Sequence, residues 1–67
     1  MNIESITRPN LISDPDVVRV VNTENATREA ILEFACNDDR VLAHRYFGTR
    51  VRLWEDDQTA DVYFYKD

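Results

Sequence analysis

The sequence predicts a small α+β protein of order β-α-β-β-β, with a C-terminal antiparallel three-stranded meander and one amphipathic helix packed on one sheet face. Three observations predict this fold. Four valines crowd one short segment, a later segment carries apolar side chains at helical spacing, and the last third contains three runs of strand-forming residues. Because 67 residues suffice for one modest core, we expect residues 1–67 to form a single domain.

The N-terminal third is predicted to hold an arm and a strand. Residues 1–14 show no clean apolar period and contain the turn-like break Arg8-Pro9-Asn10, so we expect an arm whose isoleucines pack on the body, part of it as an edge strand. The valines of residues 16–22 favour a strand. Asp14-Pro15-Asp16 also fits a helix start, which keeps a helix as the alternative there.

The only clear helix is predicted over residues 24–37. One face of this segment is apolar at the spacing of Ala26, Ala30, Ile31, Phe34 and Ala35. Thr23 or Asn25 is suited to cap its start, and Asn37 is a candidate left-handed terminator. Cations are preferred at the C-terminal end of a helix, so Asp38 and Asp39 are expected in the loop beyond it.

Residues 41–47, 50–55 and 60–66 are predicted to be the strands of the meander. Gly48-Thr49 has the composition of a two-residue hairpin turn, and residues 56–59 form a polar loop between the next two strands. This arrangement places Arg45 opposite Arg52 and Trp54 opposite Asp61. The predicted core face carries Leu42, His44, Tyr46, Val51, Leu53, Ala60, Val62 and Phe64.

The second face of the meander is predicted to combine arginines with aromatic rings. Its members are Arg45, Phe47, Arg50, Arg52, Trp54, Tyr63 and Tyr65, together with Ala43 and Asp61. One interpretation is cross-strand stabilisation by cation–π contacts. The other is a recognition surface for a protein partner, for a second copy in a homodimer or for stacked single-stranded bases, since Trp, Tyr and Arg are enriched at interface hot spots.

The charge balance of the chain is acidic. Thirteen acids against eight bases give a formal net charge of −5, which disfavours a general affinity for nucleic acid. The candidate partner-binding acids are Glu29, Glu33, Asp38, Asp39, Glu55, Asp56 and Asp57. These carboxylates form either an ordinary solvated surface or an array that mimics phosphates and occupies a basic groove.

The sequence contains no motif for catalysis, a metal or a cofactor. His44 and Cys36 are the only histidine and cysteine, and they fall on different predicted elements. A single glycine excludes phosphate-binding glycine loops. We therefore expect no enzyme activity, no cofactor and no metal. The N-terminus lacks a secretory signal and no apolar run is long enough to span a bilayer, so we expect a cytoplasmic protein without membrane contact.

In size, acidity and lack of catalytic motifs, the chain resembles the compact acidic inhibitors that phages and mobile elements encode, including anti-CRISPR proteins and inhibitors of host polymerases or nucleases. No residue string carries this resemblance, so it implies no site residues. It implies a larger host protein or ribonucleoprotein complex as partner. The alternatives are a small nucleic-acid-binding or transcription-regulatory module that uses the Arg/aromatic face, including a winged helix-turn-helix with residues 50–66 as the wing, and an accessory subunit or antitoxin-like partner.

Overall fold

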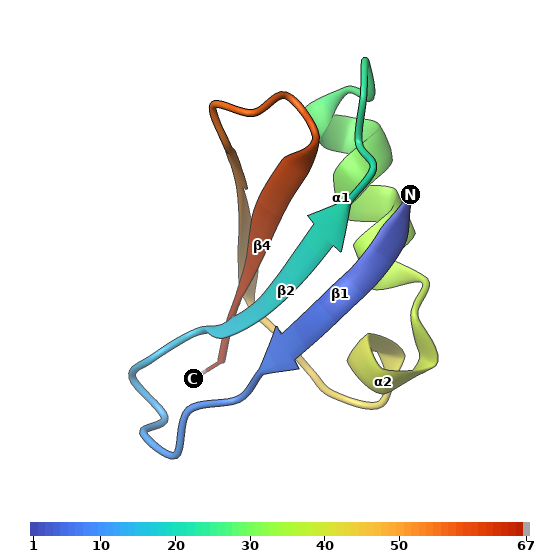
Figure 1. Cartoon of the computed structure of the whole chain (residues 1–67). Coiled ribbons are helices and arrows are strands. Elements are labelled where there is room, and N and C mark those ends of the chain that lie inside the picture. The colour runs from blue at the N-terminus through green and yellow to red at the C-terminus, as the bar shows by residue number, and fades with distance from the viewer. Residues whose placement is uncertain (67) are drawn as a thin grey trace.

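The computed structural model describes residues 1–66, which form a four-stranded antiparallel sheet and two short helices (Figure 1). The elements are the strands β1 (Asn2–Thr7), β2 (Asp16–Val21), β3 (Gly48–Leu53) and β4 (Thr59–Tyr65) and the helices α1 (Arg28–Cys36) and α2 (Asp39–Leu42). The strands lie in the order β1-β2-β4-β3, so β2 and β4 are central and β1 and β3 are the edges. The predicted α+β class is confirmed, but the predicted meander does not form.

The N-terminal arm supplies the edge strand β1. This strand pairs antiparallel with β2, and the register shifts between Ile3 and Ser5, where Glu4 is the extra residue of a β-bulge. Ile3 and Ile6 pack against the core from the same face of the sheet. The strand predicted over residues 16–22 is confirmed as β2, and the alternative helix there is wrong.

The core lies between one face of the sheet and α1. Val18 and Val20 of β2 and Ala60, Val62 and Phe64 of β4 are buried on that face. The helix presents Ile31 and Ala35, which are 0% exposed, and α2 adds Val41. Figure 1 shows α1 along this side of the sheet. No helix within residues 1–66 is long and apolar enough to cross a membrane.

The first helix begins four residues later than predicted. Thr27 is its N-cap, with Oγ1 accepting the N–H of Ala30 at 3.0 Å. Neither Thr23 nor Asn25 caps it, because the helix begins at Arg28 and both residues lie in the connection before Thr27. Asn37 ends the helix in the right-handed region, so its prediction as a left-handed terminator is wrong.

Residues 41–47 form no strand. The carboxylate of Asp38 accepts the N–H of Arg40 and caps α2, and the N–H of His44 then donates to the carbonyl of Val41 in the turn that follows. Val41 is buried while Leu42 is 62% exposed. The predicted alternation in this segment is therefore wrong: local capping by Asp38 turns the backbone before a strand can start.

The hairpin of β3 and β4 forms with a register two residues from the predicted one. Arg52, rather than Trp54, lies opposite Asp61, and Arg50 lies opposite Tyr63. The N–H of Trp54 donates to the carbonyl of Thr59, so residues 55–58 form the connection. A shift of two residues keeps every side chain on its predicted face, because side chains alternate along a strand.

The buried contact between α1 and the sheet is expected to carry much of the stability. Ile31→Ala should lower the free energy of unfolding by about 2–5 kcal/mol, because a large cavity would remain between helix and sheet. Leu42→Ala removes a similar aliphatic side chain from an exposed position and should cost less than about 0.5 kcal/mol. Urea unfolding of the two variants tests this, and equal losses would contradict the described core.

Candidate binding surfaces

Five carboxylates gather at one end of the molecule. Glu24 lies in the connection from β2 to α1, Glu29 lies in the first turn of α1, and Glu55, Asp56 and Asp57 lie in the connection from β3 to β4. Both connections are at the same end of the sheet (Figure 1). All five side chains are exposed. We call these five residues the acidic end.

Hydrogen bonds hold the two connections of the acidic end in place. The N–H of Thr23 donates to the carbonyl of Gln58 at 3.1 Å, which joins one connection to the other. The carboxylate of Asp56 accepts the N–H groups of Gln58 and Thr59, both at 3.0 Å, and the Thr59 hydroxyl at 2.8 Å. These bonds, above all that from Gln58, hold the pKa of Asp56 below its ordinary value. Asp56 is therefore a structural acid within the group.

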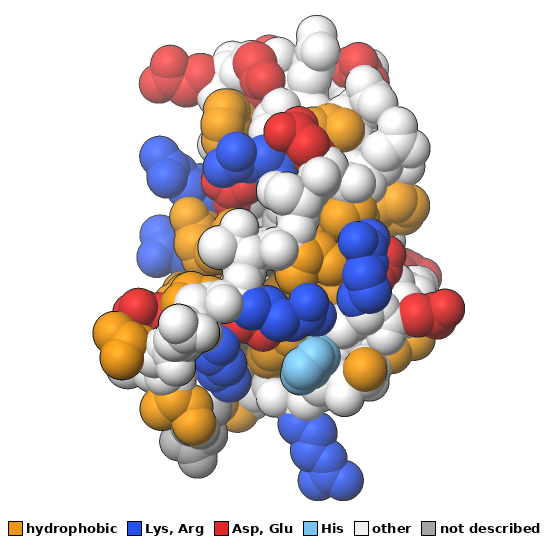
Figure 2. Space-filling view, turned by 60° about the horizontal axis from the view of Figure 1, so that its bottom comes forward, with side chains coloured by type: hydrophobic (Ala, Val, Ile, Leu, Met, Phe, Trp, Pro, Cys, Tyr) orange, Lys and Arg blue, Asp and Glu red, His pale blue; other side chains and the backbone are white. Residues whose placement is uncertain are grey.

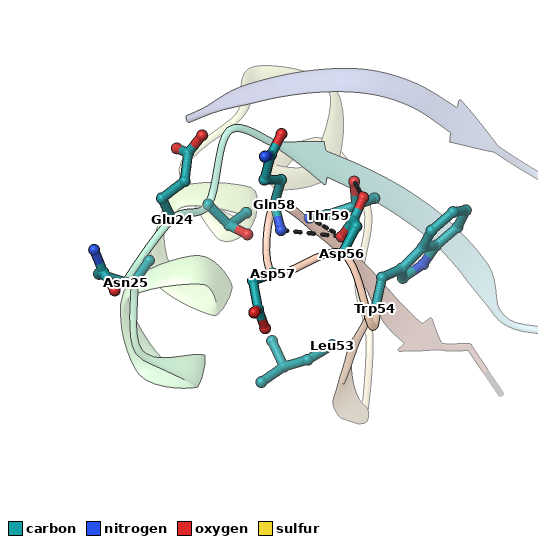
Figure 3. A pocket seen from close by; sticks show the side chains of 10 residues that line it. Glu24, Asn25, Leu53, Trp54, Asp56, Asp57, Gln58 and Thr59 are labelled. Carbon is teal, nitrogen blue, oxygen red and sulfur yellow. Dashed lines mark hydrogen bonds between the residues drawn. The ribbon is translucent and has the colours of Figure 1, made fainter.

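A shallow, polar hollow of about 620 Å³ separates the two connections. Glu24 and Asn25 line one side, while Asp56 and Asp57 line the other, with Leu53 below them (Figure 3). Asp57 adopts a left-handed backbone with a φ of 59°. The hollow thus places free carboxylates on both rims.

The other predicted acids do not join this group. Glu33 lies farther along α1, and Asp38 and Asp39 lie beyond its opposite end, at the start of α2. Asp38 is paired with Arg40, with Nε to Oδ1 at 2.9 Å. The predicted single set of acids therefore divides into the acidic end and a separate, partly paired group. The acidic end also contains Glu24, which is not among the predicted partner-binding acids and lies in the connection before α1 rather than in a helix.

The distribution of charge is uneven over the surface. In Figure 2 acidic side chains line the upper margin and others lie at mid-height and at both sides, while basic side chains and the histidine lie over the middle and lower parts. Arg8 and Lys66 belong to the end opposite the acidic end, where the chain enters β2 and leaves β4. Such a separation of charge orients the molecule relative to a charged partner during association.

The second face of the sheet is covered by no helix of the described residues. Alternation along the strands places on it the side chains of Val17, Arg19 and Val21 from β2, Arg50 and Arg52 from β3, and Asp61, Tyr63 and Tyr65 from β4. We call this surface the open face. Tyr63 and Tyr65 are half-buried, while Arg50 and Arg52 are exposed.

A buried carboxylate lies at the centre of the open face. Asp61 is only 4% exposed, and it accepts hydrogen bonds from Nε of Arg19 at 2.9 Å and Nε1 of Trp54 at 2.9 Å. The Arg19 guanidinium also stacks on the Trp54 ring at 4.6 Å from the ring centroid. Trp54 thus contacts Asp61 and Arg19 at once. Arg19 is absent from the predicted site, because its strand was not placed beside the C-terminal strands.

Three residues of the predicted Arg/aromatic surface lie outside the strands, since Trp54 directly follows the end of β3. Arg45 and Phe47 belong to the connection between α2 and β3, and both are exposed. The predicted pairing of Arg45 with Arg52 does not form, because residues 41–47 are not a strand. Arg50, Arg52, Trp54, Tyr63 and Tyr65 do come together along β3 and β4.

A second buried carboxylate lies at the end of the core face. Asp16 is 2% exposed and accepts Nζ of Lys66 at 2.7 Å and the Tyr46 hydroxyl at 2.8 Å, while Nε of Arg8 lies 3.7 Å away. Burial disfavours the charge of Asp16, but these hydrogen bonds and the charges of Lys66 and Arg8 outweigh burial and lower its pKa. The Asp16 cluster, made of Arg8, Asp16, Tyr46 and Lys66, thereby ties together the segment after β1, the start of β2, the segment before β3 and the residue after β4.

Cys36 and His44 line a smaller, mostly apolar hollow of about 270 Å³ beside Val41 and Tyr46. Burial raises the pKa of the Cys36 thiol, which disfavours the thiolate that a nucleophile requires. Within residues 1–66, no three side chains of the metal-ligating types stand close enough together to hold an ion.

No family model matches the chain, and no curated protein or solved structure compared with it matches either.

Acid should weaken the fold through the Asp16 cluster. The pKa of Asp16 is lower in the folded state than in the unfolded state. Its charge therefore contributes its full stabilisation of the fold above the ordinary carboxyl pKa of about 4, and this contribution is lost as the pH falls below that value. Asp16→Asn should therefore lower the free energy of unfolding by about 1–3 kcal/mol at pH 7 and should show a smaller further loss at pH 3 than the wild type.

Urea unfolding at both pH values measures these differences. Asp14→Asn is the matched control, since Asp14 is exposed and makes none of the contacts of Asp16. Equal acid sensitivity of the wild type and Asp16→Asn would contradict the stabilising charge.

The indole N–H of Trp54 should contribute to stability through Asp61. Trp54→Phe keeps an aromatic ring but removes this donor, so the free energy of unfolding should fall by about 1–3 kcal/mol. Phe47→Leu is the control, because Phe47 is 72% exposed and its change should stay within about 0.5 kcal/mol. Urea unfolding would contradict the hydrogen bond if both variants were equally stable.

Proposed function

We propose that the protein is a non-enzymatic inhibitor, of the type that phages and mobile elements encode, and that it binds a larger host complex that handles nucleic acid. The classes of target are a CRISPR effector, a nuclease or a polymerase. In this proposal the acidic end enters a basic groove of the target and excludes the nucleic acid by mimicking its phosphates. The open face supplies further contacts to the same protein partner.

The observation that carries the proposal is the gathering of five exposed carboxylates, four on two connections that are hydrogen-bonded to each other and one, Glu29, in the adjoining first turn of α1. Like charges held close together repel, so the array carries an electrostatic cost in the free protein. A basic groove would offset that cost and would steer the acidic end toward itself during association. Carboxylate oxygens accept hydrogen bonds from Arg and Lys in the same way as phosphate oxygens do.

The arrangement of the open face favours a protein partner over nucleic acid. Asp61 places a carboxylate at its centre, and the Arg19 guanidinium occupies the Trp54 ring where a base would stack. The net charge of −5 adds repulsion of phosphates. Direct binding of nucleic acid therefore stands as the alternative outcome of the test below.

The test neutralises the exposed acids without disturbing the loop. The triple variant Glu24→Gln/Glu55→Gln/Asp57→Asn removes three carboxylates and retains Asp56, which holds the turn. Its half-inhibitory concentration against a purified CRISPR effector, nuclease or polymerase that the wild type inhibits should rise about tenfold or more. Excess nucleic-acid substrate should relieve inhibition by the wild type, since the two compete for one groove.

The matched control is Glu4→Gln/Glu33→Gln/Asp39→Asn, which removes the same charge from exposed positions outside the acidic end. If this control lost inhibition equally, the effect would come from the net charge of the protein and not from the acidic end, which would contradict the proposed site. Failure to inhibit any of the three target classes would contradict the proposal itself. A gel shift of free DNA or RNA by the protein would favour the nucleic-acid-binding alternative.

A further inference from the structure

The strand β3 presents an unpaired backbone edge. It is the last strand of the sheet, and the N–H of Trp54 donates inward to the carbonyl of Thr59 of β4. Backbone groups alternate in direction along an antiparallel strand, so Thr49, Val51 and Leu53 direct their N–H and carbonyl groups away from β4. The outward carbonyl of Val51 accepts a hydrogen bond from Nη1 of Arg28 at 2.7 Å. This contact agrees with the alternation.

The two edges of the sheet differ in regularity. The opposite edge strand, β1, contains the bulge at Glu4, and a bulge combined with a charge hinders the addition of another strand. β3 pairs with β4 through six consecutive positions without a shift. Of the two edges, β3 is therefore the one that a further strand fits.

The side chains of β3 on the open face are unneutralised cations. Arg50 and Arg52 are exposed, and neither makes an ion pair with any residue from 1 to 66. Asp61 lies opposite Arg52, but the hydrogen bonds from Arg19 and Trp54 already engage its two oxygens. The edge strand thus carries two free guanidinium groups at alternate positions.

We propose that β3 is the docking strand for an extended acidic segment of a partner protein, which adds to the sheet as a fifth strand. The outward backbone groups of Thr49, Val51 and Leu53 would bond the segment, and its carboxylates at alternate positions would lie beside Arg50 and Arg52. This surface is distinct from the acidic end, so the inference does not depend on the inhibitory function proposed above.

A second copy of the chain fits this edge poorly. Antiparallel pairing of β3 with itself would bring the arginines of one copy close to those of the other, and like charges on neighbouring strands repel. Single-stranded nucleic acid would neutralise the arginines but has no peptide groups to bond the strand edge. An acidic polypeptide would neutralise the two arginines and would also hydrogen-bond the outward backbone groups of β3.

Arg28 blocks part of the outer edge of β3. Its guanidinium donates a hydrogen bond to the outward carbonyl of Val51. A docking strand would need this carbonyl, so the Arg28 side chain must move aside on binding. Arg28 is also a cation in the first turn of α1, where the helix dipole disfavours positive charge, so its charge does not stabilise the helix. Protecting an unpaired edge from unspecific pairing is a known use of such charged residues.

The experiment uses two fluorescein-labelled synthetic peptides, Glu-Thr-Glu-Val-Glu-Thr and its counterpart with Lys in place of Glu, and the full-length protein. Fluorescence anisotropy should detect binding of the acidic peptide and not of the basic one. Arg50→Gln/Arg52→Gln should weaken binding roughly three- to thirtyfold. Arg28→Ala should tighten it by about two- to tenfold, since the edge is then open.

A backbone variant separates strand addition from simple charge attraction. Thr49→Pro removes an outward N–H that makes no bond within the sheet, and it should abolish most of the binding, whereas Thr49→Ala should not. Far-UV circular dichroism checks that both variants fold. Slower amide hydrogen exchange at Thr49, Val51 and Leu53 in the presence of the acidic peptide would support the assignment.

Three outcomes would overturn the inference. These are equal binding of the two peptides, binding of the acidic peptide that Thr49→Pro leaves intact in a folded protein, and failure of the acidic peptide to bind Arg28→Ala. Tighter binding of a labelled oligo-dT than of the acidic peptide, lost in Arg50→Gln/Arg52→Gln, would assign the arginines to nucleic acid instead.

Discussion

One layer of helix on a four-stranded sheet is the constraint on which the rest of this structure depends. Helix α1 buries the inward side chains of β2 and β4, exemplified by Val20 and Val62, and no other described helix is placed to cover the opposite face. The open face is nevertheless not fully exposed to solvent, because neighbouring side chains such as Arg19 and Trp54 cover part of the central strand β4. Asp61 is consequently buried on the side that has no helix, and its neighbours in the sheet must satisfy it.

The two buried aspartates are neutralised by the same combination of groups. Asp61 receives a cation from Arg19 and an aromatic N–H from Trp54, and Asp16 receives a cation from Lys66 and an aromatic O–H from Tyr46. In each case the partners come from segments far apart in the sequence. A buried carboxylate is costly when unpaired, so each cluster penalises any arrangement in which its segments separate.

Local patterns predicted the central elements and the faces of the sheet, but not its order. The valines of β2, the apolar face of α1 and the alternation around Val62 are local signals, and an even register error left Arg50 and Tyr63 on the predicted face. The pairing of β1 with β2 leaves little local trace, because a bulge at Glu4 interrupts the period. Likewise α2 depends on capping by Asp38, which competed with the strand propensity of the residues that follow. The Arg19–Asp61–Trp54 cluster required the strand order, which no local pattern contains.

The sign of the surface charge reverses within a few residues along one hairpin. Arg50 and Arg52 lie on β3, and Glu55 begins the connection that belongs to the acidic end. Trp54 lies between them, held by Asp61 rather than free to rearrange. A partner that engaged both surfaces would therefore need a basic groove directly beside an acidic extended segment. Binding in the reverse orientation would oppose like charges at both surfaces, so the hairpin specifies the direction of docking more strongly than either charge alone.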